Sequence, residues 1–267
     1  MHRRALALAI LPLLIAAAPA PPPTKTESCF LLHEIGVGQV RRDPSTICDQ
    51  RFTPASTFKV PHALAALDAG VISGPDEKMI YEGGGNWPES SRRAHTLATA
   101  MKNSVVWYFQ KIAQRLGPER EASYLKKFNY GNMDGSSGLT TFWLGGSLRI
   151  SPDEQQAFML SLYQGKLPVS PKSLEQLKAI LVQPKGAVVN SMGEHPFDAP
   201  WPAGTVVSAK TGSATDASGK DVRWLVGHIK RGDHAYVFVS CVAGGEDLPG
   251  NAAIDLAAKS LRSAKVL

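Results

Sequence analysis

The hydrophobic and polar positions give the chain two β-rich ends and a helical middle. Residues 28–40, SCFLLHEIGVGQV, predict a strand, a glycine-containing turn and the start of a second strand. Toward the other end, GTVVSAKTG (204–212), DVRWLVGHIKRG (221–232) and AYVFVSCVAGG (235–245) are β-branched, alternating and separated by turns. This pattern predicts three antiparallel strands.

The segment ASTFKVPHALAALDAG (55–70) predicts a helix that ends at Gly70. Pro61 lies early in this helix, where its missing N–H affects only the first turn, so we expect a tight or bent start. The next region, HTLATAMKNSVVWYFQKIAQRLG (95–117), predicts helix with Thr96 as a possible N-cap and Gly117 as a stop.

Further helices are predicted by apolar spacing and by helix-start signals. Ser151 caps one of them, with a proline just inside and acidic residues in the first turn, and the helix after Ser170 repeats that design. The four predicted segments are PEREASYLKKF (118–128), SPDEQQAFMLSLYQGK (151–166), SPKSLEQLKAILVQ (170–183) and NAAIDLAAKSLRSA (251–264).

The order of strands, helices, strands and a last helix predicts an α+β fold. We expect the N-terminal strands to pair with the C-terminal strands in one antiparallel sheet flanked by helices, with an all-helical lobe inserted. The predicted sheet lobe spans about 24–60 and 168–267, and the helical lobe about 61–167.

The first residues are typical of a secretory signal peptide rather than of a folded element. His2, Arg3 and Arg4 precede the apolar run ALALAILPLLIAAA, which is followed by small residues. This run contains Pro12 and is shorter than the ~20 residues of a spanning helix, although an uncleaved anchor is the alternative. We assign 1–20 to the signal and 21–267 to one catalytic domain, with no integral membrane segment after cleavage.

Charge and composition narrow the partners that the protein could bind. The formal net charge is +6, of which Arg3 and Arg4 contribute two, and the basic residues are spread along the chain. This is not the dense basic face of a nucleic-acid-binding protein, so we expect no nucleic-acid partner. A mild positive charge weakly favours small anionic substrates.

The cysteines and histidines bear on redox state and metals. Export to an oxidising compartment would permit one disulfide among Cys29, Cys48 and Cys241, with Cys29–Cys48 the simplest pair because both flank the predicted hairpin. Three buried thiols are the alternative. The seven histidines show no HExxH motif and no paired ligand spacing, so we predict no metal site.

Four short segments could carry chemistry together. They are Ser56-Thr57-Phe58-Lys59, Ser104-Val105-Val106, Tyr130-Gly131-Asn132 and Lys210-Thr211-Gly212. Each is weak alone, since a serine three residues before a lysine is common and a lone KTG is usually a surface turn. In this order and at these spacings they are specific.

With these segments the sequence resembles the class D, oxacillinase-type, serine β-lactamases from about Ser28 to the C-terminus. The matching stretches are FTPASTFK, KNSVVWYFQ, YGN, FWLGGSLRIS and KTG. Neighbouring penicillin-recognising families share the serine–lysine pair and a KTG-like strand. Val106 and the Tyr130-Gly131-Asn132 segment favour class D in particular. The resemblance implies hydrolysis of β-lactams through a serine acyl-enzyme.

The serine–lysine pair has the spacing of a nucleophile and its base. Ser56 and Lys59 are one helical turn apart and share a face. Ser56 lies near a helix N-terminus, where unpaired N–H groups favour negative charge, so its own N–H is a candidate for half of an oxyanion hole. Lysine is a poor base at its ordinary pKa of about 10.4, and burial among apolar groups would lower that pKa.

The resemblance implies that Lys59 takes up CO2 and acts as an N6-carboxylysine, the general base of both acylation and deacylation. No other cofactor is expected. Val106 would keep the amine neutral and the pocket dry, and the indole N–H of Trp143 would donate to the carbamate. Ordinary core packing is the alternative for Trp143.

The remaining site residues are assigned by the same resemblance. Ser104 would relay a proton to the lactam nitrogen, and Lys210 would supply positive potential beside it. Thr211 would bind the substrate carboxylate, and Gly212 would allow close approach of the strand. The N–H of Ser213 would complete the oxyanion hole. Tyr130 and Asn132 are expected to line the site in a mainly structural role.

The sequence departs from the family pattern at two places. Many members carry a carboxylate-binding arginine where the alignment of DLPGNAAI puts Asn251. That clamp is either missing or supplied by another group such as Arg223, because asparagine cannot copy a bidentate arginine. The stretch SATDASGKD after KTG is polar and changes the rim of the site.

Two other functions remain open at this point. A β-lactam sensor module would acylate without efficient deacylation, and a transpeptidase or carboxypeptidase would act on cell-wall peptides. Sensors are tethered to a receptor's membrane region, and transpeptidases usually carry a polar residue at the place of Val106. We therefore expect a periplasmic β-lactamase, monomeric or homodimeric, whose partner is a small β-lactam.

Overall fold

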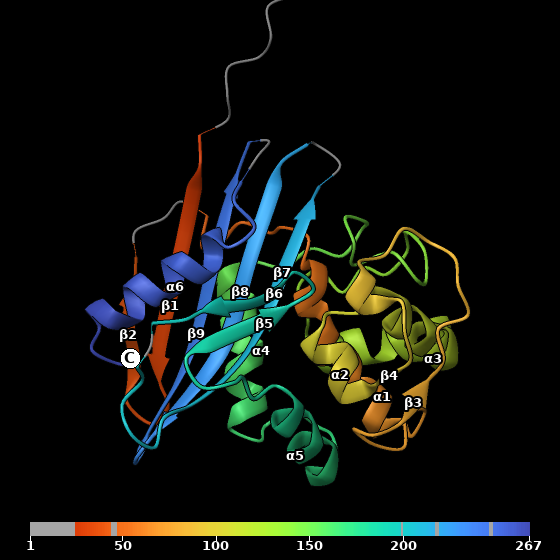
Figure 1. Cartoon of the computed structure of the whole chain (residues 1–267), viewed down its shortest axis with the longest axis horizontal. Helices are drawn as coiled ribbons and strands as arrows, with labels where there is room; N and C mark the ends of the chain where they lie inside the picture. Colours follow the sequence, from red (N-terminus) through yellow and green to blue (C-terminus); the bar gives the residue numbers. More distant parts are fainter. Residues whose placement is uncertain (1–24, 44–46, 199, 217–218, 246–247) are drawn as a thin grey trace, which may run out of the picture.

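The computed structural model describes residues 25–43, 47–198, 200–216, 219–245 and 248–267. The predicted signal peptide, 1–20, lies outside the described residues. Figure 1 shows a sheet with helices on both of its faces and a cluster of helices to one side. This arrangement confirms the predicted α+β class.

The central sheet has five antiparallel strands in the order β2-β1-β9-β8-β7. Its first and last strands in sequence are neighbours, since Cys29 of β1 is paired with Cys241 of β9. The edge strand β7 carries the KTG segment. The strands are β1 (Glu27–Glu34), β2 (Gly38–Arg42), β7 (Val206–Thr215), β8 (Asp221–Arg231) and β9 (His234–Gly244).

Alternation along the strands divides the core into two layers. In β1, Cys29 and Leu31 face one cluster of buried side chains, whereas Phe30 and Leu32 face the other. Helix α6 (Ala252–Ser263) contacts β8, β9 and β1 on the second side. Helix α4 (Pro152–Tyr163) contacts the same three strands, and its Phe158 belongs to the first cluster.

The helical lobe is built around a single buried helix. The chain passes from the 3-10 turn η1 (Ala55–Phe58) directly into α1 (Lys59–Asp68), which is the tight start expected from Pro61. Helix α1 contacts α3 (Val106–Lys127) and α5 (Pro171–Ile180). Nine of its ten residues are buried, so its position is fixed from all sides.

Two helices contact elements of the other lobe from the one in whose predicted residue range they fall. Helix α4 falls within the range predicted for the helical lobe, yet it packs against the sheet. Helix α5 falls within the predicted sheet lobe, yet it contacts α1 and α2 (Leu97–Lys102). The helical spacing is correct in both cases, but it does not say which neighbour covers the apolar face.

The long helical region 95–117 is broken in the middle. Thr96 caps α2 as predicted, and the helix then ends at Lys102 before α3 begins at Val106. Gly117 has φ 76° and ψ 163°, so the helical path is interrupted there and restarts at Pro118. The predicted stop at Gly117 is therefore a kink within α3.

Several short elements have no clear signal in the sequence. They are the hairpin of β5 (Ala187–Asn190) and β6 (Gly193–Pro196), the two-residue strands β3 (Lys78–Met79) and β4 (His95–Thr96), and η2 (Glu89–Ser91). The strand pairings are short, with two residue pairs between β3 and β4 and four between β5 and β6.

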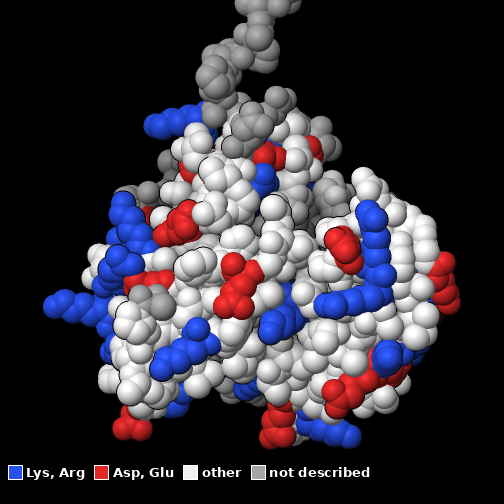
Figure 2. All heavy atoms as spheres, in the orientation of Figure 1, with Lys and Arg blue, Asp and Glu red and all other residues white. Residues whose placement is uncertain are grey.

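Cys29 and Cys48 form a disulfide, and Cys241 is a buried free thiol. On the face drawn in Figure 2, basic and acidic side chains are interspersed with neutral ones rather than gathered into one basic patch. Within the described residues, no helix combines the length and apolar character needed to cross a membrane.

Candidate active site

Ser56 and Lys59 face one another at the start of the buried helix. The Nζ atom of Lys59 lies 2.6 Å from Ser56 Oγ, within hydrogen-bonding distance. Ser56 is half-buried in η1, and Lys59 is the first residue of α1. The residue before the serine, Ala55, has φ 49°, a left-handed conformation that non-glycine residues rarely adopt. The backbone is thus bent sharply where it presents the hydroxyl.

Lys59 is fully buried, which makes its ammonium form unfavourable. Burial lowers the pKa of Lys59 well below its usual 10.5, and the positive charge of Lys210 lowers it further. The Nζ atom also lies 5.5 Å from the centroid of the Phe109 ring. A neutral amine beside a serine hydroxyl can accept its proton, which an ammonium cannot.

Ser104 and Lys210 form a second serine–lysine pair. Lys210 Nζ donates to Ser104 Oγ at 3.0 Å and to the Thr211 carbonyl at 2.9 Å. Ser104 lies in the break between α2 and α3 and has φ 56°. Burial lowers the pKa of Lys210 to about 7. This lysine can therefore exchange a proton with Ser104 near neutral pH.

The strand β7 is pressed against η1 at Gly212. A Cβ atom at Gly212 would lie 2.9 Å from the Pro54 carbonyl oxygen and 3.0 Å from Thr57 Cγ2. Only glycine fits without moving one of the two segments. Thr211 is buried next to it, and its Oγ1 lies 3.4 Å from Lys210 Nζ. Ser213 follows and is exposed.

Trp143 lies in the aromatic wall behind the serine–lysine pair. It is fully buried, and its ring centroid is 5.5 Å from that of Phe58, the residue before Lys59. Its Nε1–H has no hydrogen-bond partner among the residues that the structure describes. A buried indole N–H usually has an acceptor, so this donor is available to one.

Thr53 ties the loop that carries Trp143 to the segment just before Ser56, a contact that the sequence does not suggest. Its hydroxyl donates to the Trp143 carbonyl and accepts from the Gly145 N–H, both at 3.0 Å. Its own carbonyl accepts from the indole N–H of Trp224 at 3.0 Å. These contacts span three distant segments, so no local motif could have revealed them.

Tyr130, Gly131 and Asn132 brace the site from behind. The amide of Asn132 donates to the Ser147 carbonyl at 2.8 Å and accepts from the Arg149 N–H at 2.9 Å. Gly131 has φ 58°, and a Cβ there would collide with the Arg149 carbonyl.

A hydrogen-bonded chain links this segment to the turn that carries Ser56. Buried Tyr130 contacts the Gln155 Oε1 atom at 3.3 Å, and the Gln155 amide donates to Thr57 Oγ1 at 2.7 Å. The sequence gives no sign of the contact between Gln155 and Thr57, because the two residues lie in segments that are far apart along the chain. These hydrogen bonds join neighbouring segments of the chain to one another.

The other sequence-derived positions lie at the edges of the site. Val106 is half-buried as the first residue of α3, two residues beyond Ser104. Asn251 precedes α6 and donates its side-chain amide to Asp255 at 2.9 Å. Arg223 donates from Nη2 to Asp221 at 2.6 Å and to the Leu248 carbonyl at 3.0 Å. A substrate clamp by Arg223 would have to break that pairing.

Among the described residues, no cluster of three or more histidine, cysteine, aspartate or glutamate side chains could hold a metal ion. The groups brought together are two hydroxyls, two buried lysines and an indole donor. This set suits nucleophilic attack by a hydroxyl with proton transfer to and from amines.

Comparisons with known proteins agree with this chemistry. The family model of the penicillin-binding protein transpeptidase domain matches residues 16–263. The probable β-lactamase YbxI of Bacillus subtilis is 32% identical over 234 residues, which cover 88% of this chain and 81% of that protein. A solved class D β-lactamase from Bacillus subtilis is 30% identical with a TM-score of 0.78, covering 91% of this chain and 93% of the other.

A regulatory relative also matches. The regulatory protein BlaR1 of Bacillus licheniformis is 30% identical over 208 residues, which cover 78% of this chain and 32% of that protein. The likeness is thus confined to a part of that longer protein.

Proposed function

This chain belongs to the class D β-lactamases and hydrolyses β-lactams, and from that premise we propose how its residues divide the reaction. Ser56 is the nucleophile, Lys59 provides the base, and Ser104 with Lys210 handles the proton of the leaving nitrogen. The observation that carries this division is the pair of serine–lysine contacts, 2.6 Å and 3.0 Å long.

In acylation, Ser56 Oγ forms a bond to the lactam carbonyl carbon while its proton passes to the base at Lys59. The lactam C–N bond then breaks, and the nitrogen takes a proton from Ser104, which Lys210 resupplies. The pKa of about 7 for Lys210 suits this exchange at neutral pH. The base at Lys59 then gives up the proton it took, and Lys210 regains one. In deacylation the free base takes a proton from the attacking water and gives it to Ser56 Oγ as the ester C–O bond breaks.

The negative oxygen that develops on the carbonyl needs two donors. The Ser56 N–H, at the first turn of η1, and the Ser213 N–H, on β7, are our candidates for this oxyanion hole. Gly212 supports the assignment, since its close contact with Pro54 and Thr57 sets the spacing between the two segments.

We propose that Lys59 is carboxylated in the working enzyme. The neutral amine would form an N–C bond with CO2 and release one proton, and the resulting carboxylate would serve as general base. Two features fit this modification: burial keeps Lys59 neutral, and the Trp143 indole N–H is a buried donor without an acceptor among the described residues.

The substrate carboxylate is assigned to Thr211 together with Lys210. The Thr211 hydroxyl and the Lys210 ammonium lie 3.4 Å apart, so one anion can contact both. Asn251 and Arg223 are engaged with Asp255 and Asp221, respectively. This arrangement would replace the arginine clamp found in many class D enzymes.

We further propose export to the periplasm after removal of the signal 1–20. The Cys29–Cys48 disulfide supports an oxidising compartment. The proposed partner is a small β-lactam, with no nucleic acid, and the enzyme is taken to act as a monomer or homodimer.

The function is tested by a turnover assay on a chromogenic β-lactam, with and without added bicarbonate. We expect many turnovers per enzyme and a higher rate with bicarbonate. One stoichiometric burst without a steady state would instead favour a sensor, the alternative to which the BlaR1 similarity points. An equal turnover rate with and without bicarbonate would count against carboxylation of Lys59.

A further inference from the structure

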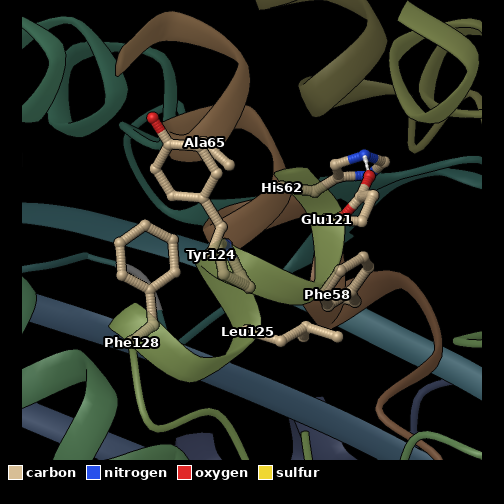
Figure 3. A pocket seen from close by; sticks show the side chains of 8 residues that line it. Phe58, His62, Ala65, Glu121, Tyr124, Leu125 and Phe128 are labelled. Atoms are coloured by element: carbon tan, nitrogen blue, oxygen red, sulfur yellow. Dashed lines mark ion pairs between the residues drawn. The ribbon is translucent and has the colours of Figure 1, made fainter. Parts of the chain in front are cut away.

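A narrow pocket lies between α1 and α3, behind the wall that carries the nucleophile. Figure 3 shows His62 and Glu121 pointing toward one another at one end of this pocket, with aromatic side chains around them. His62 is on α1, three residues after Lys59, and Glu121 is on α3 beyond the kink at Gly117. Neither residue belongs to the reaction described above.

His62 and Glu121 form a buried polar pair in apolar surroundings. The His62 Nε2 and Glu121 Oε1 atoms are 2.5 Å apart, and the residues are only 1% and 4% exposed. Such a pair contributes little net stability, since well-packed apolar side chains of similar volume often serve as well or better. Such a pair can instead serve to fix a geometry.

The geometry in question is that of the rings around Lys59. The His62 ring lies 5.4 Å from Trp143, with an interplanar angle of 63°, and 5.1 Å from Phe58. It also lies 5.9 Å from Phe109, the ring that Lys59 Nζ faces. His62 is therefore a shared neighbour of three rings in this wall.

Trp143 depends on such packing for its orientation. Its Nε1–H has no partner within the described part of the chain, so no hydrogen bond from that atom sets the direction of the ring. Its backbone is held by Thr53, but the plane of the indole is set by the rings beside it. The His62 ring also contacts the Glu121 carboxyl group, with Nε2 2.5 Å from Oε1, although the ring nitrogens have no hydrogen bond of normal geometry within the described residues.

We propose that His62 and Glu121 are positioning residues for the modified lysine. The close contact with Glu121 restricts where the His62 ring can lie, and the edge contact of that ring with Trp143 holds the indole N–H toward the group on Lys59. The pair thereby sets how tightly Lys59 holds CO2. This inference rests on the proposed carboxylation and adds the two residues that tune it.

A simpler role would be a cross-link between α1 and α3, and the chain offers a matched control for it. Asp68, at the end of α1, accepts from Tyr124 at 2.9 Å and from Lys127 at 3.1 Å, both on α3. Asp68→Asn weakens another contact between α1 and α3, and like Glu121→Gln it replaces a carboxylate by an amide. It lies at the opposite end of α1 from Lys59.

The experiment measures two quantities in the complete mature enzyme, residues 21–267. One is the bicarbonate concentration that gives half-maximal turnover, and the other is the carbamate signal of Lys59 in ¹³C NMR with labelled bicarbonate. We expect Glu121→Gln to raise the bicarbonate concentration for half-maximal turnover by about tenfold. Losing a residue that orients the direct contacts of a bound group typically has an effect of this size. Saturating bicarbonate should restore turnover, and Asp68→Asn should leave the concentration unchanged.

A second variant covers the case that Glu121→Gln does not fold. The double change His62→Leu with Glu121→Leu removes the pair but keeps an apolar filling, which buried pairs tolerate. We expect it to fold, to need more bicarbonate and to give a weaker carbamate signal at a fixed bicarbonate concentration.

The failures of the two proposals are distinguishable. If the wild type responds to bicarbonate and the folded variants respond identically, the positioning role is wrong. If the wild type shows neither a carbamate signal nor a bicarbonate response, the carboxylation of Lys59 is wrong and the positioning role is overturned with it.

Discussion

Lys210 Nζ and Ser104 Oγ are 3.0 Å apart, although 106 residues separate them in sequence. Lys210 is on β7 of the sheet, whereas Ser104 is in the break between two helices of the other lobe. The contact can therefore exist only when the lobes are docked correctly. If this pair acts as we propose, turnover depends on that docking as well as on the individual side chains.

Lys59→Ala removes the base without touching the nucleophile. We expect steady-state turnover to fall by about 10²–10⁴-fold, the usual contribution of a general base. Any acyl-enzyme that still forms should be long-lived, which mass spectrometry of the protein after mixing with substrate would detect. Lys178→Ala, which removes a lysine beside Tyr163, is the control. Full turnover by the Lys59 variant would refute the assignment.

Gly212→Ala should separate β7 from the nucleophile turn. The added Cβ meets two groups of η1 and its approach at 2.9 Å and 3.0 Å, so the strand must shift. We expect a loss of about 1–3 kcal/mol in unfolding free energy and a larger proportional loss of acylation rate. Gly250→Ala is the matched control, since nothing lies within 4 Å of its added Cβ. Equal effects of the two changes would contradict the close-contact argument.

The buried Lys210 should make stability depend on pH. Its pKa is about 7 in the folded state and about 10.5 when unfolded, so between these values the unfolded chain binds more protons. The unfolding free energy should thus rise with pH above 7, by up to about 1.4 kcal/mol per pH unit. Denaturant titrations at pH 7.0 and 8.5 should give a smaller rise for Lys210→Met. An unchanged rise would mean that Lys210 is not buried in the uncharged form at high pH.

Thr211→Val keeps the shape of the side chain but removes its hydroxyl. We expect KM for a carboxylate-bearing β-lactam to rise by about tenfold, as for loss of a hydrogen bond to a charged group. The methyl ester of the same substrate has no anion to bind, so it should respond little to the change. An equal effect on acid and ester would place the hydroxyl in another role.

Reducing the Cys29–Cys48 disulfide should destabilise the sheet lobe. The bond closes a loop with a sequence separation of 19, which corresponds to about 3 kcal/mol of unfolded-chain entropy. We expect a lower melting temperature with a reductant in the wild type and no response in Cys48→Ala. Cys241→Ala, at a buried free thiol, should remain sensitive to the reductant.

Local signals in the sequence were sufficient for the strands of the central sheet, for most helices and for the contact between Ser56 and Lys59. The contact between Ser104 and Lys210 was expected only from the family resemblance, because 106 residues separate the two side chains. Thr96 and Ser151 accept from N–H groups one turn away, so their caps depend on short-range chemistry. The close spacing of Ser56 and Lys59 likewise brings them together within one turn. The side of the sheet that α4 covers, and the helices that α5 contacts, depend on tertiary packing and could not be predicted from the same pattern.

The residues that support the site could not be predicted from the sequence, because their contacts also depend on tertiary packing. Thr53 and Gln155 contact partners at least ninety residues away, and Glu121 meets His62 only because two helices pack together. A single sequence gives no sign of which polar residue is buried opposite which. The proposed nucleophile, Ser56, stands in a recognisable local motif, whereas the residues packed around it are known only from the fold.

The order of the strands has a consequence for the making of the enzyme. β1 leaves the ribosome near the beginning of synthesis, yet its partner β9 is among the last segments to emerge. Contacts of such long sequence separation form slowly. A chain interrupted before β7 would already contain Ser56, Lys59 and Ser104 but would lack Lys210 and three of the five strands of the sheet. We therefore expect incomplete chains to be inactive, because the proposed nucleophile would lack its strand β7 and Lys210 until almost the whole chain is made.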